Sequence, residues 1–217
     1  MPNAPSGSED RLAKVVLIGT PGVGKSVILK AVAEQYAHGS IRAGEIGEGK
    51  IFRTEFFWPE VLPGGGRLRI RLFALSGRPV YNAITELVLA EADGIVFVAN
   101  LARDQGPAAQ EALETMVRNA KLNKLDLATL PVAMHYHQPL AGPVPTSLFK
   151  AEEMDQLLGL APGSVVRFVT DPGDNGLLRG PVEWIAARIA SGGKDLPNPV
   201  RADGVSIPEG SQLVARV

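Results

Sequence analysis

The stretch that decides the fold is Gly19-Thr20-Pro21-Gly22-Val23-Gly24-Lys25-Ser26, which satisfies the pattern G-x-x-x-x-G-K-[ST] at every fixed position. An apolar run, Val15 to Ile18, precedes it and predicts a buried strand, and residues 27–36 follow with apolar side chains at helical spacing. A glycine-rich loop between a strand and a helix directs backbone N–H groups and the positive helix end at phosphate oxygens. The sequence therefore predicts a phosphate-binding loop, in which Lys25 reaches the β- and γ-phosphates and Ser26 ligates Mg²⁺.

Composition limits the classes of function. The chain has 217 residues, of which 45% are hydrophobic and 21% charged, enough to bury a sizeable core. Its net charge of −1 argues against a role on nucleic acid or on an anionic membrane. There is no cysteine, which excludes disulfides, zinc-thiolate sites, thiol nucleophiles, and prenyl or palmitoyl anchors. Because we see neither a signal peptide nor a long apolar run, we expect a cytoplasmic protein without a membrane anchor.

Strand-like and helix-like patterns alternate along the chain. Strands are predicted at 14–18, 51–58, 67–75, 94–99, 132–136 and 165–170, and helices at 27–38, 81–91, 107–122, 151–158 and 181–190. This alternation favours an α/β domain with a mostly parallel sheet, helices on both faces and one antiparallel edge strand.

The segments between and outside these elements divide the chain into three parts. Residues 39–49 are punctuated by glycine and are predicted to form a long loop. We expect the domain to span 11–190, between a flexible N-terminus at 1–10 and a C-terminal extension at 191–217. The extension is Gly/Pro-rich and then alternates weakly, which fits an edge strand and a trailing segment equally well.

Arginines alternate with aliphatic residues in the predicted strand at 67–75. Arg67, Arg69 and Arg71 occupy every second position, a period that is typical of a sheet-edge strand with one solvated face. We interpret these arginines either as a solvated face or as a surface that contacts a partner.

The order of elements resembles that of the Ras-like P-loop GTPases, and most closely that of the bacterial MglA family of gliding-motility and polarity GTPases. Arg53-Thr54-Glu55-Phe56-Phe57 is similar to the family's R-T-x-F-F in its first switch. Residues 71–83 resemble, in shortened or offset form, its R-F-H-L-Y-T-V-P-G-Q…F-Y-D-A segment, and residues 92–99 resemble its V-D-G-V-V-F-V-A-D strand. The resemblance covers roughly residues 12–190.

This resemblance implies a molecular switch that binds GTP or GDP with Mg²⁺, with a roadblock-fold (MglB-like) regulator and effector proteins as partners. It implies that Thr54 completes the Mg²⁺ coordination begun by Ser26, and that the Gly77 N–H senses the γ-phosphate. Arg53 corresponds to a family arginine that can act as an intrinsic finger, although a solvated arginine is an equal alternative. The nucleotide-binding residues that we expect are Gly19, Thr20, Pro21, Gly22, Val23, Gly24, Lys25, Ser26, Val27, Thr54, Gly77, His137 and Gln138.

The chain departs from the family pattern where hydrolysis would take place. Arg78 replaces the water-positioning Gln, and a guanidinium has only donors, so it cannot accept a hydrogen bond from the attacking water. It can still stabilise charge on the phosphate, so Arg78 and Arg53 are the candidate catalytic residues. The stretch Ala74-Leu75-Ser76-Gly77 also lacks the carboxylate of D-x-x-G. We therefore expect hydrolysis to be slow or absent.

The guanine-reading motif N-K-x-D occurs in the letters Asn123-Lys124-Leu125-Asp126, but we interpret this as a chance match. The motif must follow a buried strand directly, whereas Asn123 ends a helical pattern and the strand at 132–136 comes later. Aligned by that strand, the reading position is His137-Gln138-Pro139-Leu140, in which Leu140 replaces the guanine-binding Asp. Each lost hydrogen bond to a charged partner is worth roughly 1.5–3 kcal/mol, so we expect relaxed base selectivity.

His135 and His137 form an H-x-H pair on one face of a strand end, a spacing that can ligate a metal. No third ligand is evident in the sequence.

Three functions remain open at this point. The intact phosphate loop and Thr54 favour a nucleotide-dependent switch. Ala74, Arg78 and Leu140 favour a pseudo-GTPase that keeps the fold and acts as an interaction or scaffold module. The loss of the guanine-binding Asp favours a base-nonselective P-loop NTPase.

Overall fold

The computed structural model describes residues 9–46, 49–76, 82–138, 147–170 and 175–192. Its strands are β1 (Arg11–Gly19), β2 (Arg42–Ile46), β3 (Gly49–Val61), β4 (Arg67–Ser76), β5 (Gly94–Asn100), β6 (Val132–His137) and β7 (Val166–Thr170). Its helices are α1 (Lys25–Tyr36), α2 (Asn82–Leu89), α3 (Gly106–Leu122), α4 (Ala151–Leu157) and α5 (Asn175–Ala190), with a 3-10 turn, η1 (Arg103–Gln105).

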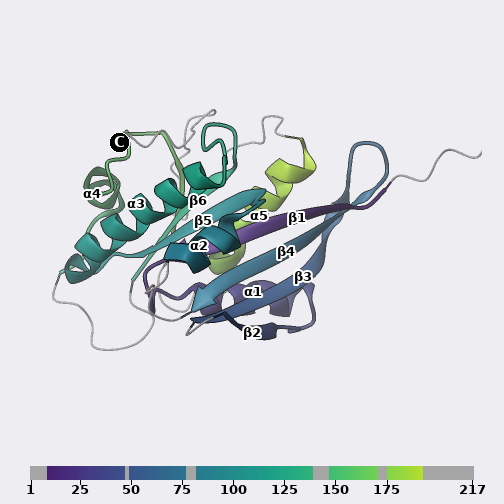
Figure 1. Cartoon of the computed structure of the whole chain (residues 1–217), viewed down its shortest axis with the longest axis horizontal. Coiled ribbons are helices and arrows are strands. Elements are labelled where there is room, and N and C mark those ends of the chain that lie inside the picture. The colour runs from purple at the N-terminus through teal and green to yellow at the C-terminus, as the bar shows by residue number, and fades with distance from the viewer. Residues whose placement is uncertain (1–8, 47–48, 77–81, 139–146, 171–174, 193–217) are drawn as a thin grey trace, which may run out of the picture.

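All described strands belong to one sheet in the order β2-β3-β4-β1-β5-β6-β7. Strands β4, β1, β5, β6 and β7 run parallel to one another, whereas β3 is antiparallel to both of its neighbours. Helices α1 and α5 cover one face of this sheet, and α2, α3 and α4 cover the other (Figure 1). This confirms the predicted class, an α/β fold of the P-loop NTPase type with a mostly parallel sheet.

The outer edge of the sheet differs from the prediction. Residues 39–49 were expected to form a loop, but residues 42–46 within them form the edge strand β2, so β3 lies second from the edge. The described side chains of β2 are exposed. Because they bury nothing, the stretch lacks the apolar alternation by which a strand is recognised in a sequence.

Strand β4 is likewise not an edge strand, since it lies between β3 and β1. Its alternation has another cause. Leu68, Ile70 and Leu72 are buried under α1, while the intervening arginines project from the opposite face. On that opposite face Phe73 and Leu75, near the C-terminal end of β4, belong to the same hydrophobic cluster as α2, whereas Arg67 is exposed and Arg69 and Arg71 are half-buried.

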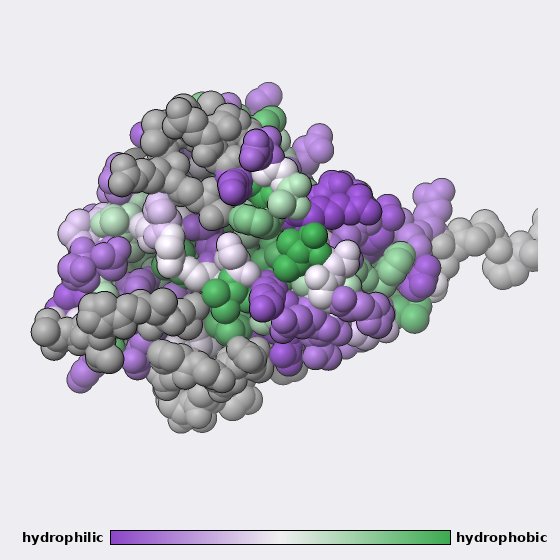
Figure 2. Space-filling model, turned by 90° about the horizontal axis from the view of Figure 1, so that it is seen from below, coloured by the Kyte–Doolittle hydropathy of each residue, from purple (hydrophilic) through white to green (hydrophobic). Residues whose placement is uncertain are grey.

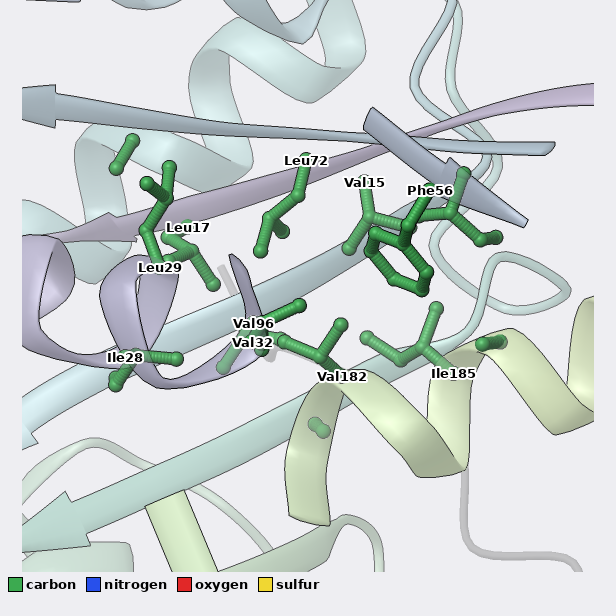
Figure 3. Packing of buried hydrophobic residues seen from close by; sticks show 14 of the residues in the cluster. Val15, Leu17, Ile28, Leu29, Val32, Phe56, Leu72, Val96, Val182 and Ile185 are labelled. Atoms are coloured by element: carbon green, nitrogen blue, oxygen red, sulfur yellow. The ribbon is translucent and has the colours of Figure 1, made fainter. Parts of the chain in front are cut away.

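The core beneath α1 and α5 holds the start of α1 in place. Figure 3 shows Leu29 and Val32 of α1 and Val182 and Ile185 of α5 directed at the same side of the sheet as Val15. Each of these five side chains is essentially inaccessible to solvent, and full burial of such a side chain contributes roughly 1.5–3 kcal/mol. The loop between β1 and α1 is therefore held at both ends by well-packed elements.

Helix α5 begins at Asn175, six residues before the predicted start at 181. The prediction placed Pro181 in the first turn, where the missing N–H costs nothing. In the structure Pro181 lies inside the helix. Leu178 and Val182, on either side of it, are both buried in the core, which stabilises the helix through the proline.

Candidate phosphate-binding site

The loop between β1 and α1 has the backbone of a phosphate cradle. Gly19 has φ 148°, and a Cβ atom there would lie 2.0 Å from the carbonyl oxygen of Val98 on β5, so only glycine fits. Gly22 and Gly24 have φ 74° and 93°, in the left-handed region that glycine adopts without strain. Gly24 is the N-cap of α1, and the amides of Val27 and Ile28 donate to its carbonyl oxygen.

Lys25 places its ammonium group over this loop. Its Nζ donates to the carbonyl oxygens of Gly19 at 2.8 Å and of Thr20 at 2.6 Å. The side chain is only 6% exposed, and this burial lowers the pKa of Lys25 to about 8. Among the described residues only these two carbonyl oxygens contact the ammonium, and a buried cation without a carboxylate partner is well suited to gain a phosphate oxygen.

The first turn of α1 is open to a ligand. Ser26 and Val27 are exposed, and the turn contains no acidic side chain that would offset the positive end of the helix dipole. The Ser26 hydroxyl is therefore accessible beside the cradle, as a Mg²⁺ ligand would have to be. The structure thus brings the predicted loop residues together into one site.

His137, at the end of β6, supports the loop from within the protein. Its ring is buried, Nε2 contacts the carbonyl oxygen of Val23, and Nδ1 lies 2.7 Å from the carbonyl oxygen of Gln138. A proton on Nε2 allows the ring to donate to Val23. His137 was predicted as a nucleotide-binding residue, and the structure places it behind the loop, where it links β6 to the loop backbone.

His135 lies one pleat further back on the same face of β6. Its ring centroid is 5.8 Å from that of His137, its Nε2 is 2.9 Å from the Thr170 hydroxyl oxygen, and its Nδ1 has no partner among the described residues. Burial lowers the pKa of His135 to about 3, so this ring is neutral in the folded protein. Within the described part of the chain no group of three potential metal ligands exists, so the H-x-H pair has no third ligand there.

Thr54 is not brought to the phosphate loop. It lies inside β3 opposite Leu72 of β4, and Leu72 is opposite Val15 of β1. Val15 is four residues before Gly19, so along the strand direction Thr54 lies about 13 Å from the start of the loop. Its side chain is buried, and its hydroxyl donates to the carbonyl oxygen of Ser40 at 2.7 Å. In this arrangement Thr54 cannot share a Mg²⁺ ion with Ser26, and its predicted role stays a prediction that requires β3 to move.

Arg53 is also distant from the loop. It lies opposite Phe73 of β4 and projects from the open face of the sheet, whereas α1 covers the other face. Its assignment as a catalytic finger therefore also remains a prediction. Sequence reasoning did not single out Lys50. It lies opposite Ser76 at the end of β4, and the parallel register of β4 with β1 places this end beside the end of β1.

The letters N-K-x-D lie at the wrong edge of the sheet to read a base. Asn123 is the C-cap of α3, and its amide nitrogen donates to the carbonyl oxygens of Glu86 at 2.8 Å and Asn119 at 3.0 Å. Asp126 accepts hydrogen bonds from the Ala128 amide and the Thr129 hydroxyl. The segment precedes β6, so it lies at the amino edge of the parallel strands, whereas the phosphate loop follows the carboxyl end of β1.

Some predicted site residues lie outside the described residues. These are Gly77 and Arg78, which the sequence assigned to a second switch. Pro139 and Leu140, the last two residues of the aligned base-reading position, also lie outside the described residues. The carbonyl of Val98 and the contact from His137 to the loop were missed by sequence reasoning. The Val98 carbonyl is a backbone group, which a sequence does not reveal. His137, at the end of an otherwise apolar strand, could have been predicted to contact the neighbouring loop.

Comparison with known proteins gives one partial match. No family model matches the chain. A stretch of 74 residues, 34% of this chain, is 31% identical to the Mutual gliding-motility protein MglA of Myxococcus xanthus (strain DK1622), and it spans 38% of that protein's length. The match supports a relationship to the small GTPases at a coarse level. None of the helices in the described ranges is long and apolar enough to cross a membrane.

Proposed function

We propose that this chain is a nucleotide-dependent switch of the small-GTPase type, which binds GTP or GDP with Mg²⁺ at residues 19–26. One observation carries the proposal: three glycines with positive φ shape a strand–loop–helix cradle, and the buried ammonium of Lys25 lies over it. The partial similarity to MglA supports guanine as the base. We further propose that the switch acts in the cytoplasm and that a roadblock-fold regulator and effector proteins are its partners.

The residues of the cradle divide the binding work among them. The loop and α1 amides would donate to the phosphate oxygens, Lys25 would neutralise their charge, and Ser26 would hold Mg²⁺. Mg²⁺, when bound, would offset the negative charge shared by the β- and γ-phosphates. Because Arg78 replaces the water-positioning Gln and Thr54 is buried in β3, we expect hydrolysis to be slow.

The test is calorimetric titration of nucleotide-stripped protein with GTP, GDP and ATP, each with Mg²⁺. Micromolar or tighter binding of GTP, at least tenfold weaker for GDP, is the expected result for a switch. A single-turnover measurement with bound GTP then gives the hydrolysis rate, and a rate like that of ordinary small GTPases would contradict the expected slowness.

Ser26 offers a matched pair of variants for the same titration. Ser26→Ala removes the hydroxyl from an exposed position, so it should abolish the gain in affinity that Mg²⁺ brings without disturbing the core. Ser26→Thr keeps a hydroxyl and should retain that gain. If Mg²⁺ raises the affinity for nucleotide equally in both variants, Ser26 does not ligate the ion.

A second candidate is a pseudo-GTPase or a base-nonselective NTPase, and two observations favour it. The hydroxyl of Thr54 in β3 already donates to the carbonyl oxygen of Ser40, and the only N-K-x-D letters in the sequence lie at the opposite edge of the sheet. Absence of binding to all three nucleotides by a folded sample would support the interaction module. Equal binding of ATP and GTP would support the nonselective enzyme.

A further inference from the structure

We propose that the open face of β3 and β4 beside β2 is a docking site for an acidic, extended segment of a partner protein, which adds as a strand along the outer edge of β3. In this structure the surface lies away from the phosphate loop, and it contains Arg53, so the inference concerns the nucleotide-free arrangement and is tested without nucleotide.

Like charges face each other across two strands at this surface. Arg42 of β2 lies directly opposite Arg53 of β3, an arrangement that destabilises a strand pair. Three residues along the same pair of strands, Glu45 lies opposite Lys50, which is the favourable arrangement. Within the part of the chain that the structure describes, neither Arg42 nor Arg53 lies within ion-pair distance of a carboxylate, although the charge of Arg53 contributes to the lowered pKa of the nearby Glu55. A bound anion would reduce the repulsion between the two arginines.

The two arginines belong to a larger positive hollow. A cavity of about 400 Å³ is lined by Arg42, Arg53, Arg69 and Arg71, together with Glu55. Glu55 pairs with Arg71 at 2.8 Å and with Arg69 at 3.2 Å, and the hydrogen bond from Arg71 lowers the pKa of this carboxyl group. Four arginines against one glutamate leave positive charge in excess, so the complementary ligand carries several carboxylates.

The backbone beside the cavity offers a strand edge. Strand β2 pairs only with residues 49–53 of β3, and Ser40, just before β2, accepts a hydrogen bond from the Thr54 hydroxyl. No described strand pairs with the outer side of β3 beyond Thr54. Every second residue there directs its N–H and C=O groups outward, and such a free edge accepts an added strand. The usable length is short: Ser40 contacts Thr54 at one end, and at the other the register of β3 shifts between Phe57 and Val61, where Pro59 also lacks an N–H.

Side chains next to the edge fit the same occupant. Phe57 is 41% exposed on the arginine-bearing face, and the guanidinium of Arg67 lies 4.1 Å from its ring centroid. Figure 2, seen from the side on which the edge strand β2 lies in Figure 1, shows that many side chains on this side of the described chain are hydrophilic. A strand with acidic and apolar side chains in alternation would place its carboxylates among the arginines.

A protein strand fits this site better than nucleic acid does. The positive charge is confined to one hollow on a chain whose net charge is −1, whereas nucleic-acid binding uses an extended basic surface. A free sheet edge also has no role in phosphate-backbone recognition, while it supplies the backbone hydrogen bonds of a peptide complex.

The test uses a fluorescein-labelled decapeptide of alternating Glu and Val, measured by fluorescence anisotropy against the full chain. We expect saturable binding that weakens as salt is raised from 50 to 300 mM, because the contacts are ionic. The same peptide with Lys in place of Glu, and a single-stranded DNA decamer, should bind at least tenfold more weakly. Binding of the DNA as tight as that of the peptide would overturn the proposal in favour of a nucleic-acid surface.

Two further arms separate the parts of the site. Arg42→Glu combined with Arg53→Glu should weaken binding of the acidic peptide at least tenfold, whereas Arg118→Glu, an exposed charge reversal on α3, should leave it unchanged. An acidic peptide with N-methyl groups on alternate residues keeps its charge but cannot pair with β3, so it should also bind at least tenfold more weakly. Absence of peptide binding, or equal binding by the arginine variants with intact circular dichroism, would refute the site.

Discussion

At the scale of single residues, Lys25 makes phosphate binding depend on pH. Burial lowers its pKa to about 8, so in the free protein it loses its proton as pH rises through 8. A bound triphosphate favours the charged form and raises that pKa, so binding takes up a proton above pH 8. We expect the affinity for GTP with Mg²⁺ to fall by up to about tenfold per pH unit above pH 8.

Calorimetry at pH 9 in two buffers of different ionisation enthalpy measures this proton uptake directly. Lys25→Ala should bind GTP weakly and show no difference between the buffers. If the wild type shows no proton uptake at pH 9, Lys25 does not meet the phosphates.

His137 acts on the site through the loop backbone. His137→Leu leaves the Val23 carbonyl without its contact from β6, and an unsatisfied buried acceptor costs roughly 1–3 kcal/mol. We expect about tenfold weaker GTP binding and faster amide exchange in the loop. His137→Gln carries an N–H donor at a comparable reach and should recover most of the affinity; a Gln variant as weak as the Leu variant would mean that ring packing, not the hydrogen bond, supports the loop.

At the scale of elements, one polar cluster attaches α4 to the sheet. Tyr136 of β6 donates to Asp155 of α4 at 2.7 Å, and Arg167 of β7 pairs with the same carboxylate. Tyr136→Phe removes a buried hydrogen bond to a charged group, so the free energy of unfolding should fall by about 1.5–3 kcal/mol in urea denaturation. An unchanged midpoint would show that Arg167 alone holds Asp155.

The elements also show how far sequence reasoning extends. Most strands and helices that bury apolar side chains were predicted within a few residues, because burial imposes a period on the sequence, whereas the start of α5 was predicted six residues too late. Strand β2 was missed because its described residues bury nothing, and β4 was taken for an edge strand because an uncovered face leaves the same alternation. The loop at 19–26 was predicted because its glycines are required by backbone geometry, whereas the position of Thr54 depends on the register of β3, which local sequence does not specify.

At the scale of the whole molecule, the sheet carries a neutral histidine in its interior, and this makes the fold sensitive to acid. Burial lowers the pKa of His135 to about 3, whereas in the unfolded chain it is near 6.5. Below pH 6.5 the unfolded chain therefore binds a proton that the folded protein does not, and stability falls as pH decreases from 6.5 toward 3. His135 therefore lowers the free energy of unfolding by about 1.4 kcal/mol per pH unit below 6.5, or by about 2 kcal/mol at pH 5.

The measurement is urea denaturation of the wild type and of His135→Leu at several values between pH 7 and pH 4.5. The substitution also removes the contact with Thr170, so the absolute free energies will differ at every pH. The informative quantity is the slope, because carboxylates elsewhere titrate equally in both proteins and cancel in the difference. We expect the variant to lose less stability per pH unit than the wild type; parallel slopes would mean that the folded protein accommodates a protonated His135, and acid sensitivity would then have to arise elsewhere in the sheet.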